Sequence, residues 1–294
     1  MTIIQSIIIA VVEGLTEFLP ISSTAHMKFT NPLINVNAEA PFTQMFEVVI
    51  QLAAILAVVV LYRKQFFNFK RIGFYIKLII AVIPALIVGV LLKSYINSAL
   101  GNLTAIACIM IGGGVLLLFI DKMFTVHTIE EESKITNKSA FMIGCFQVLS
   151  VLLPGLSRSA ATIIGGMSQK LSRSLAAEFS FFLAVPTMLA ASTKSFYDAC
   201  KASYLAVNNI SEAQAETMKV SMGSLFGKEN LSNLFTYDNT MALIVGCVVS
   251  FVVALLAIRF FIGFVKKYGF RMWGFYRIIV GIIMLVLLWR NVIQ

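Results

Sequence analysis

The sequence predicts an all-α polytopic membrane protein, and three observations lead to that class. Of its 294 residues, 59% are hydrophobic and 13% are charged, whereas soluble domains have roughly 45–50% and about 25%. The mean hydropathy is +0.90, and several apolar runs approach the roughly 20 residues that a helix needs to cross a bilayer. Two further apolar segments are interrupted by proline and polar residues. We expect one membrane domain over residues 1–294.

Six uninterrupted apolar segments are long enough to be transmembrane helices. Their expected bounds are 43–62, 72–93, 103–120, 176–197, 240–262 and 272–290. Lysine and arginine, which produce the net charge of +9, cluster between these runs and not along one polar face. The charge therefore indicates membrane topology, and we expect no nucleic-acid partner.

The two interrupted segments cover residues 2–29 and 139–168, with breaks at 18–24 and 153–159. Proline removes a backbone donor and disfavours helical geometry in the residue before it. Each half is too short to span a bilayer alone. The segments are therefore predicted to be two re-entrant helical hairpins, whose turns must be buried in protein or line a wet cavity.

The interrupted segments also resemble each other, which suggests an internal duplication. A shift of 134 positions places Pro20 on Pro154 and Ser23 on Ser157. Interrupted segments at corresponding places in two halves are a sequence indicator of a central site near the membrane midplane. We therefore expect the two turns to lie close together.

Basic residues near the span ends predict the orientation of the chain. The segments 63–77 and 259–271 are rich in lysine and arginine, which places both in the cytoplasm. Counting outward, the hairpins enter from opposite sides, so the repeats 1–120 and 139–290 have inverted topology. A polar stretch at about 198–239 then lies outside, as either an ordered or a flexible loop.

Glu13 and Glu17 interrupt the first hairpin, where a charge at the membrane centre costs roughly 2.5–3.5 kcal/mol. At positions i and i+4 they share a helix face, so they repel unless one is protonated or a cation lies between them. A protonated pair hydrogen-bonded to the turn is one interpretation. We favour a divalent cation, because Mg²⁺ is usually held by one or two carboxylates together with phosphate oxygens.

Three hydroxyl residues, Ser22, Ser23 and Thr24, follow the first proline, and His26 lies one helical turn after Ser23. An imidazole can take the hydroxyl proton, attack phosphorus itself, or protonate a leaving oxygen. The sequence does not choose among these roles. Hydroxyl residues after a proline also commonly cap a helix N-terminus, and Ser22 fits that role equally well.

Arg158 lies in the second break, where a buried arginine needs an anion. Its planar guanidinium suits the paired oxygens of a phosphate. Three neighbouring hydroxyls can add donors at the N-terminus of a half-helix: Ser157, Ser159 and Thr162. The alternative is an ion pair with Glu13 or Glu17. Both interpretations can hold if the ion pair forms in the empty site and phosphate displaces the carboxylate from Arg158.

Other anomalous residues are interpreted as structural. Glu47 and Glu178 lie near span ends and are expected to cap helices or face water. The glycines 112–114 are expected to allow close helix packing, because no strand precedes them as in a phosphate-binding loop. His127 lies in a polar loop and is given no role.

Residues 13–26, EGLTEFLPISSTAH, resemble the first signature of the bacterial undecaprenyl-diphosphatase or bacitracin-resistance family, and residues 154–162, PGLSRSAAT, resemble its second. The stretches 46–52, 178–186 and 268–278 are also similar to the family, so the resemblance covers nearly the whole chain. Ala53 departs from it, since a glycine is usual there, and the 198–239 loop is longer than is typical.

The resemblance implies hydrolysis of undecaprenyl diphosphate to undecaprenyl phosphate and inorganic phosphate, which recycles the lipid carrier for peptidoglycan synthesis. It implies bacitracin resistance, because bacitracin competes for the same lipid, and dependence on a divalent cation, Mg²⁺ or Ca²⁺. It also implies a multi-pass protein of the bacterial plasma (inner) membrane, surrounded by lipids, with a site open to the periplasmic or outer face. Whether the protein forms a homodimer is left open.

The family's functional residues match this sequence without a gap. The resemblance implies metal binding by Glu13 and Glu17 and catalytic roles for Glu17, Ser23, His26 and Arg158. Six further residues of the matching stretches are predicted substrate contacts: Ser22, Thr24, Gln51, Ser157, Ser159 and Thr162. The rival class is a transporter or lipid flippase, for which inverted repeats and broken helices are typical. A hydroxyl beside an imidazole favours an enzyme, because transport needs no nucleophile.

Overall fold

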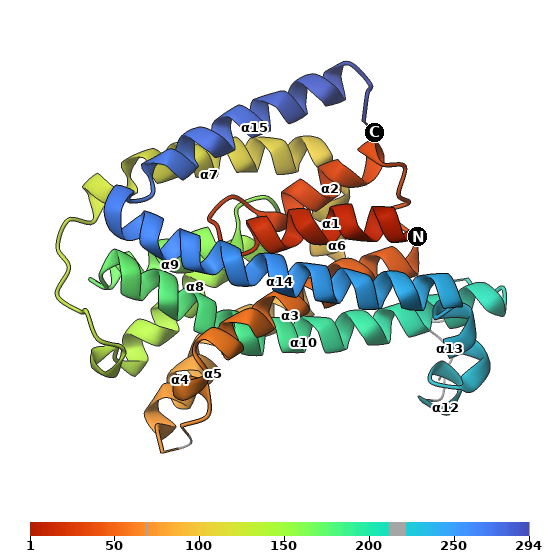
Figure 1. The fold of residues 1–294 in the computed structure, drawn as a ribbon, viewed down its shortest axis with the longest axis horizontal. Coiled ribbons are helices and arrows are strands. Elements are labelled where there is room, and N and C mark those ends of the chain that lie inside the picture. Colours follow the sequence, from red (N-terminus) through yellow and green to blue (C-terminus); the bar gives the residue numbers. More distant parts are fainter. Residues whose placement is uncertain (69, 212–221, 294) are drawn as a thin grey trace.

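The structure is a computed structural model that describes residues 1–68, 70–211 and 222–293. In these ranges the chain is helical, and its extended residues form no strand beyond one isolated bridge (Figure 1). The helices, in chain order, are α1 (Ile3–Thr16), α2 (Ser23–Leu33), α3 (Pro41–Leu61), α4 (Arg63–Phe66), α5 (Ile72–Leu91), α6 (Lys93–Gly101), α7 (Leu103–Met123), η1 (Glu132–Lys134), α8 (Asn137–Leu152), α9 (Arg158–Ser168), α10 (Arg173–Val207), α12 (Met222–Leu225), α13 (Lys228–Leu234), α14 (Tyr237–Tyr268) and α15 (Arg271–Trp289).

Six of these helices are long and apolar enough to cross a membrane: α3, α5, α7, α10, α14 and α15. The predicted number of spans is therefore confirmed, and their centres match. The helices α10 and α14 are longer than expected, with 35 and 32 residues, because polar residues continue each helix beyond its apolar run.

The stretch 198–239 was expected to be a loop, and this prediction is partly wrong because much of its described part is helical. Residues 198–207 continue α10, and α12, α13 and the first turn of α14 occupy most of the described remainder. A polar composition without strong periodicity does not by itself distinguish such short helices from a loop. Residues 212–221 of this stretch lie outside the described part.

Both interrupted segments break where the prolines predicted. The first divides into α1 and α2, and the second into α8 and α9. Ser22 and Ser157 are the N-caps of α2 and α9, and each side chain accepts a backbone N–H at 3.3 Å. This confirms the capping interpretation of Ser22. Both serines have positive φ, 72° and 78°, which is uncommon outside glycine.

The two caps do not fall at the same place in the shift of 134 positions that suggested a duplication. Ser22 and Ser157 are the N-caps, so the first helical residues are Ser23 and Arg158, whereas the shift matched Ser23 with Ser157. The second turn contains the additional residue Gly155, whose φ is 98°. A Cβ atom there would lie 2.6 Å from a backbone oxygen of α7, so only glycine fits.

Helices from the two halves pack against each other in matching pairs. The helix α1 lies along α14 and α8 lies along α5, while α3 packs on α10 and α7 on α15. At Gly14 in α1 and Gly144 in α8, a Cβ would lie 2.7 Å from Ser250 O and 2.3 Å from Ala81 O. Glycine thus permits close backbone approach in both pairs.

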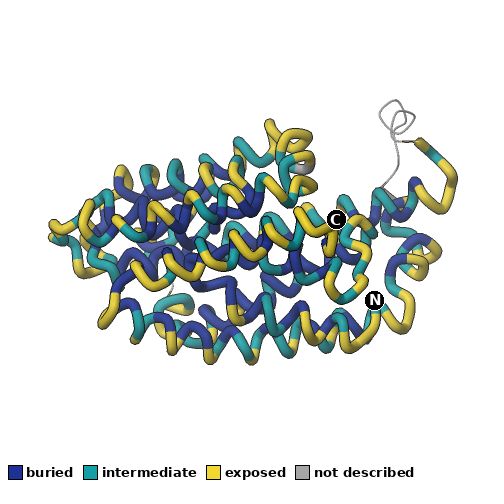
Figure 2. Tube along the Cα trace, turned by 90° about the horizontal axis from the view of Figure 1, so that it is seen from above, coloured by how far each residue is buried: buried dark blue, intermediate teal, exposed yellow. Residues whose placement is uncertain are grey.

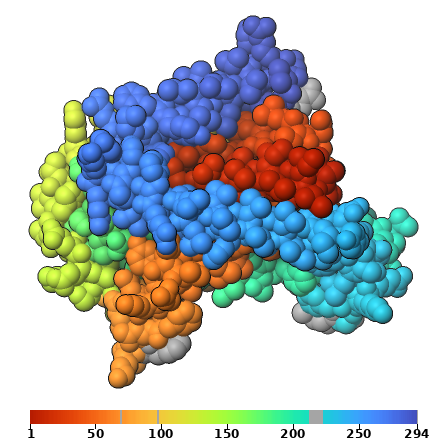
Figure 3. Space-filling model, in the orientation of Figure 1, coloured from red at the N-terminus to blue at the C-terminus, as the bar shows by residue number. Residues whose placement is uncertain are grey.

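Figure 3 shows the first interrupted segment between α14 and α15, where part of it is exposed on the surface. Buried residues lie toward the interior and exposed ones at the periphery in Figure 2. Many exposed side chains are large and apolar, such as Leu91 at 74%, Leu256 at 65% and Ile279 at 57%. A surface so apolar is unfavourable in water and matches a hydrocarbon environment.

Candidate active site

Glu17 joins the two interrupted segments at the centre of the bundle. Arg158, at the start of α9, donates from Nη2 to Glu17 Oε1 at 2.6 Å, and Ser23 Oγ, at the start of α2, donates to Glu17 Oε2 at 2.5 Å. Of the two acids considered as partners of Arg158, Glu17 therefore forms the ion pair. One carboxylate holds a hydroxyl and a guanidinium from opposite halves of the chain.

The hydroxyls around Arg158 connect the turns to their surroundings. Ser159 Oγ donates to Leu19 O at 2.9 Å in the opposite turn, and Ser157 Oγ lies 3.0 Å from Ser159 Oγ. Thr162 Oγ1 lies 2.7 Å from Ser180 Oγ, on α10. These three predicted substrate contacts thus have protein partners in this structure, and their contact with substrate stays a prediction.

Glu13 contrasts with Glu17 one helical turn later. It is completely buried, and neither carboxylate oxygen has a hydrogen-bond partner. Buried polar atoms are normally paired, so the Glu13 oxygens fit a cation that the protein does not itself supply, or a proton shared with the neighbouring Glu17 carboxyl group. Glu17 is a less suitable cation ligand than Glu13, because both Glu17 carboxylate oxygens already accept hydrogen bonds.

The cation would not be enclosed by protein ligands alone. Within the part of the chain that the structure describes, no three His, Cys, Asp or Glu residues gather as a metal site. Mg²⁺ commonly keeps several waters and adds substrate phosphate oxygens to one or two carboxylates. Glu13 is therefore suited to a shared site that substrate completes.

His26 is oriented by partners at both ring nitrogens. Nδ1 lies 2.8 Å from Ser22 O, and Nε2 lies 2.9 Å from the hydroxyl of Tyr276 in α15. The imidazole and phenol rings are stacked, with centroids 5.7 Å apart and planes 11° apart. The hydrogen bonds recorded for the described residues pair Ser23 with Glu17 and His26 with Tyr276, not Ser23 with His26.

Arg277, next to Tyr276, was not identified from the sequence. It is fully buried and bonds to backbone oxygens of both turns and of α7. The acceptors are Pro20 O at 3.0 Å, Leu156 O at 2.7 Å, Gly155 O at 2.8 Å and Met110 O at 3.0 Å. An arginine inside an apolar run is the same signal that identified Arg158, and it was available here too.

The glycine run of α7 accommodates this arginine. A Cβ on Gly113 would lie 2.4 Å from Arg277 Nη2, and one on Gly114 would lie 2.9 Å from Gly274 O. The expected role of the run in close helix packing is therefore confirmed for these two residues. Gly112 has open space around it.

Glu47 has a structural role, as expected, but it neither faces water nor caps a helix, because it is buried within α3. It pairs with Lys28 at 3.3 Å and accepts a hydrogen bond from Asn31 Nδ2 at 2.6 Å. Gln51, one turn further along α3, is 9% exposed, and Thr24 is half-buried in the first turn of α2. The roles of Gln51 and Thr24 as substrate contacts stay predictions.

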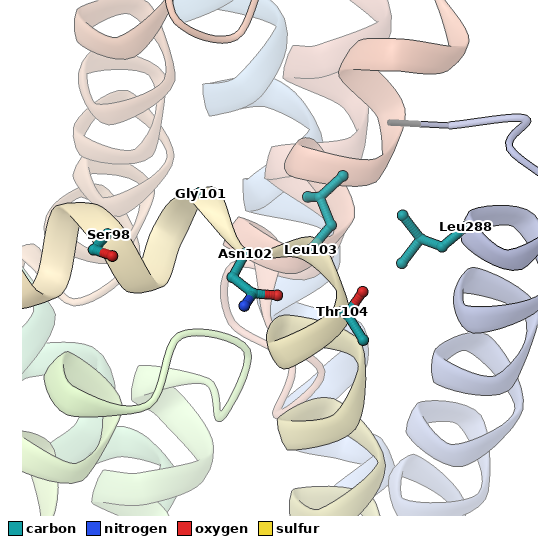
Figure 4. A pocket seen from close by; sticks show the side chains of 6 residues that line it. All are labelled: Ser98, Gly101, Asn102, Leu103, Thr104 and Leu288. Atoms are coloured by element: carbon teal, nitrogen blue, oxygen red, sulfur yellow. The ribbon is translucent and has the colours of Figure 1, made fainter.

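Two hollows on the surface lie apart from the reactive residues. One, of about 510 Å³, lies between α6, α7 and α15, where Leu288 faces Leu103 and Thr104 (Figure 4). The other, of about 330 Å³, is lined by Glu130, Ser172, Ser174, Leu175, Glu178 and Lys266. Neither lining includes a predicted catalytic residue, which agrees with the burial of those residues among the helices.

The fold and this site define a multi-pass membrane protein with a charged centre at two helix breaks. A family model described as "Bacitracin resistance protein BacA" matches residues 6–283. The chain is 43% identical to an undecaprenyl-diphosphatase of Porphyromonas gingivalis across 99% of both chains, and 45% identical to one of Flavobacterium johnsoniae across 98% of this chain and 96% of that one. The "Undecaprenyl-diphosphatase 2" of Clostridioides difficile is 40% identical across 99% and 97%. This chain belongs to the BacA family.

Proposed function

We propose that this chain removes the terminal phosphate of undecaprenyl diphosphate, releasing undecaprenyl phosphate and inorganic phosphate. Family membership and nearly full-length relatives named for that activity support the substrate. The observation that carries the chemistry is the Glu17 carboxylate between Ser23 and Arg158. The product would re-enter cell-wall synthesis, and the reaction would consume the lipid that bacitracin binds.

The arrangement suits phosphoryl transfer, which depends mainly on positioning and charge neutralisation. Arg158 exchanges its contact with Glu17 for oxygens of the terminal phosphate, which its planar fork matches. Glu17 Oε2 accepts the Ser23 proton while Ser23 Oγ attacks phosphorus and the bond to undecaprenyl phosphate breaks. Water then attacks the phosphorus of phosphoserine and breaks its bond to Ser23 Oγ, which releases inorganic phosphate. Glu17 returns the proton to Ser23 Oγ. His26 is less suited to attack, because its Nε2 faces Tyr276.

A divalent cation, Mg²⁺ or Ca²⁺, is part of this proposal. When bound, it would neutralise charge on the diphosphate. Glu13 is the residue best placed to hold it, because its buried oxygens have no other partner.

The proposed topology is an inverted repeat of residues 1–120 and 139–290, with α1–α2 and α8–α9 as re-entrant hairpins in the bacterial plasma membrane. The matching helix pairs and N-caps support it. The site would open to the outer face. Thiol labelling of intact cells tests this: a cysteine at Lys64 should react only after permeabilisation, and one at Ser232 should react before it; reversed labelling would contradict the orientation.

Purified protein in detergent micelles is expected to release phosphate from undecaprenyl diphosphate. A transporter or flippase would release none, because it breaks no bond. The Glu17→Gln variant is the matched control, since it keeps the size of the side chain and removes the acceptor of the Ser23 proton. Equal phosphate release by Glu17→Gln and the unaltered protein would contradict the proposed chemistry.

Replacing Glu13 with glutamine is expected to lower phosphate release about 100-fold, as loss of several kcal/mol of charge stabilisation would. Residual activity should no longer rise with added Mg²⁺. Glu47→Gln is the control, because Glu47 is also buried but is paired with Lys28. Cation titrations of both variants decide the point: an unchanged Mg²⁺ response in Glu13→Gln would remove Glu13 from the cation site.

A further inference from the structure

We propose that Arg277 is a positioning residue that holds the two turns at a fixed separation, so that Ser23 from one turn and Arg158 from the other meet the same phosphate. The inference deepens the proposed phosphatase function and rests on it. Arg277 lies in α15, 257 positions from Pro20 and 121 from Leu156. Its side chain is fully buried.

A single nitrogen atom of Arg277 joins the two turns. Nη1 donates to Pro20 O at 3.0 Å in the first turn and to Leu156 O at 2.7 Å in the second, and Nη2 donates to Gly155 O at 2.8 Å. Carbonyl groups in a helix break lack the partners of a regular helix, and an unpaired one is costly inside a membrane. The guanidinium group therefore satisfies both turns only while both lie close to it.

Arg277 is itself fixed to a pair of closely packed helices. Its Nε donates to Met110 O in α7 at 3.0 Å, and α7 packs along α15. A Cβ atom on Gly114 would lie 2.9 Å from Gly274 O, so the two backbones approach closely beside the arginine. Both turns are therefore tied to the same two helices through one side chain.

The carbonyl groups that Arg277 binds lie close in sequence to the reacting residues. Pro20 is three residues before Ser23, and Leu156 is two residues before Arg158. A displacement of either turn would therefore move Ser23 Oγ relative to the Arg158 guanidinium group. A misplacement of reacting groups by about 1 Å can lower a rate about 100-fold.

The contribution of Arg277 increases when substrate binds. In the structure the two turns are also joined by the contacts of Arg158 with Glu17 and of Ser159 Oγ with Leu19 O. In the proposed reaction Arg158 exchanges Glu17 for phosphate, so one of these two contacts is lost. The recorded partners of Arg277 in the described part of the chain are all carbonyl oxygens. Phosphate therefore displaces no carboxylate from Arg277, and its bonds can persist through the reaction.

Gly113→Ala tests the proposal without changing a charge or a reacting residue. The added Cβ atom would lie 2.4 Å from Arg277 Nη2, so the guanidinium group must shift. We expect kcat to fall about 100-fold, with KM changed less than about 3-fold because Arg158 still reaches the phosphate. Gly112→Ala is the matched control, since its Cβ would meet no atom within 4 Å. Equal kcat values for the two variants would overturn the proposal.

The Arg158→Lys background distinguishes positioning from a general structural effect. A lysine ammonium is a point charge without a fixed fork, so its action depends less on the alignment of the turns. If Gly113→Ala acts through the placement of Arg158, it should lower kcat less than about 10-fold in this background. A further loss of about 100-fold would show that the two changes act independently, and the proposal would be wrong.

Solid-state NMR tests the contact without turnover. Protein with ¹⁵N in its arginine side chains and ¹³C in its proline carbonyl groups should show dipolar coupling between Arg277 Nη1 and the Pro20 carbonyl carbon. The coupling should persist in Gly112→Ala and weaken in Gly113→Ala. Its absence from the unaltered protein, or its full retention in Gly113→Ala, would contradict the proposal. A lack of phosphate release by the unaltered protein would instead contradict the proposed function, so the two failures are distinguishable.

A second variant, Arg277→Lys, is used if size-exclusion chromatography shows that Gly113→Ala does not fold. Lysine keeps the charge, but its one ammonium group replaces three separate nitrogen atoms and cannot reach all the carbonyl groups. We expect kcat to fall about 100-fold. Arg290→Lys is the control, because Arg290 is exposed at the end of α15. Normal kcat in a folded Arg277→Lys protein would overturn the proposal.

Discussion

Alanine in place of Ser23 is expected to lower phosphate release from undecaprenyl diphosphate by at least about a thousand-fold, as loss of a nucleophile does in comparable enzymes. Ser23 is the hydroxyl that donates to Glu17, at 2.5 Å, and that carboxylate also meets Arg158. In the proposed mechanism, removing Oγ removes the attacking atom and leaves the Arg158 guanidinium in place. Labelled phosphate release in micelles measures the effect.

The matched control for this change is Ser150→Ala. Ser150 lies in α8, and its hydroxyl donates to Gln147 O within the same helix. That variant should stay near the activity of the unaltered protein. If Ser23→Ala kept activity within about tenfold, nucleophilic catalysis by Ser23 would be wrong, and His26 or water would have to attack. Acid quenching during turnover should also trap phosphoserine in the unaltered protein and none in Ser23→Ala.

The second large effect is expected for Arg158→Lys, with kcat/KM lowered about 100- to 1000-fold. Arginine offers two parallel donors to a phosphate, whereas lysine acts as a point charge. Arg158 uses Nη1 for Ser180 O at 3.1 Å and Nη2 for Glu17, so its fork is held in one orientation. Phosphate release against substrate concentration measures the loss.

Arg173→Lys is the control for Arg158→Lys. Arg173 also pairs with a carboxylate, that of Asp121 at 2.6 Å, but lies outside the site and is more exposed. Breaking a buried ion pair can cost about 3–5 kcal/mol of stability, so thermal unfolding of each variant must be followed. Near-normal kcat/KM in a folded Arg158→Lys protein would show that Arg158 only balances the charge of Glu17.

Much of the fold could be predicted from local patterns. Apolar runs near the membrane thickness predicted six spans, because hydrophobic length is a property of consecutive residues. Pro20 and Pro154 marked both helix breaks, since proline acts on its own turn of helix. The helices in the described part of the 198–239 stretch were not predictable in this way, because its polar sequence has no strong periodicity.

The composition of the site was also largely readable from the sequence. Charged residues in apolar segments are costly, which singled out Glu13, Glu17 and Arg158 before any contact was known. The same reasoning applied to Arg277 would have marked it as anomalous, yet its partners are carbonyl oxygens, and backbone groups carry no signature in the sequence.

By itself, then, the sequence determined the membrane class, the two breaks and most of the candidate site residues, because the cost of a buried charge and the spacing of residues are local properties. Only the tertiary structure decided which side chains pair. In it Ser23 bonds to Glu17 and His26 bonds to Tyr276, and Ser22 and Ser157 are the N-caps of α2 and α9. Such partners come from helices far apart in the chain, and which side chains meet depends on how those helices pack.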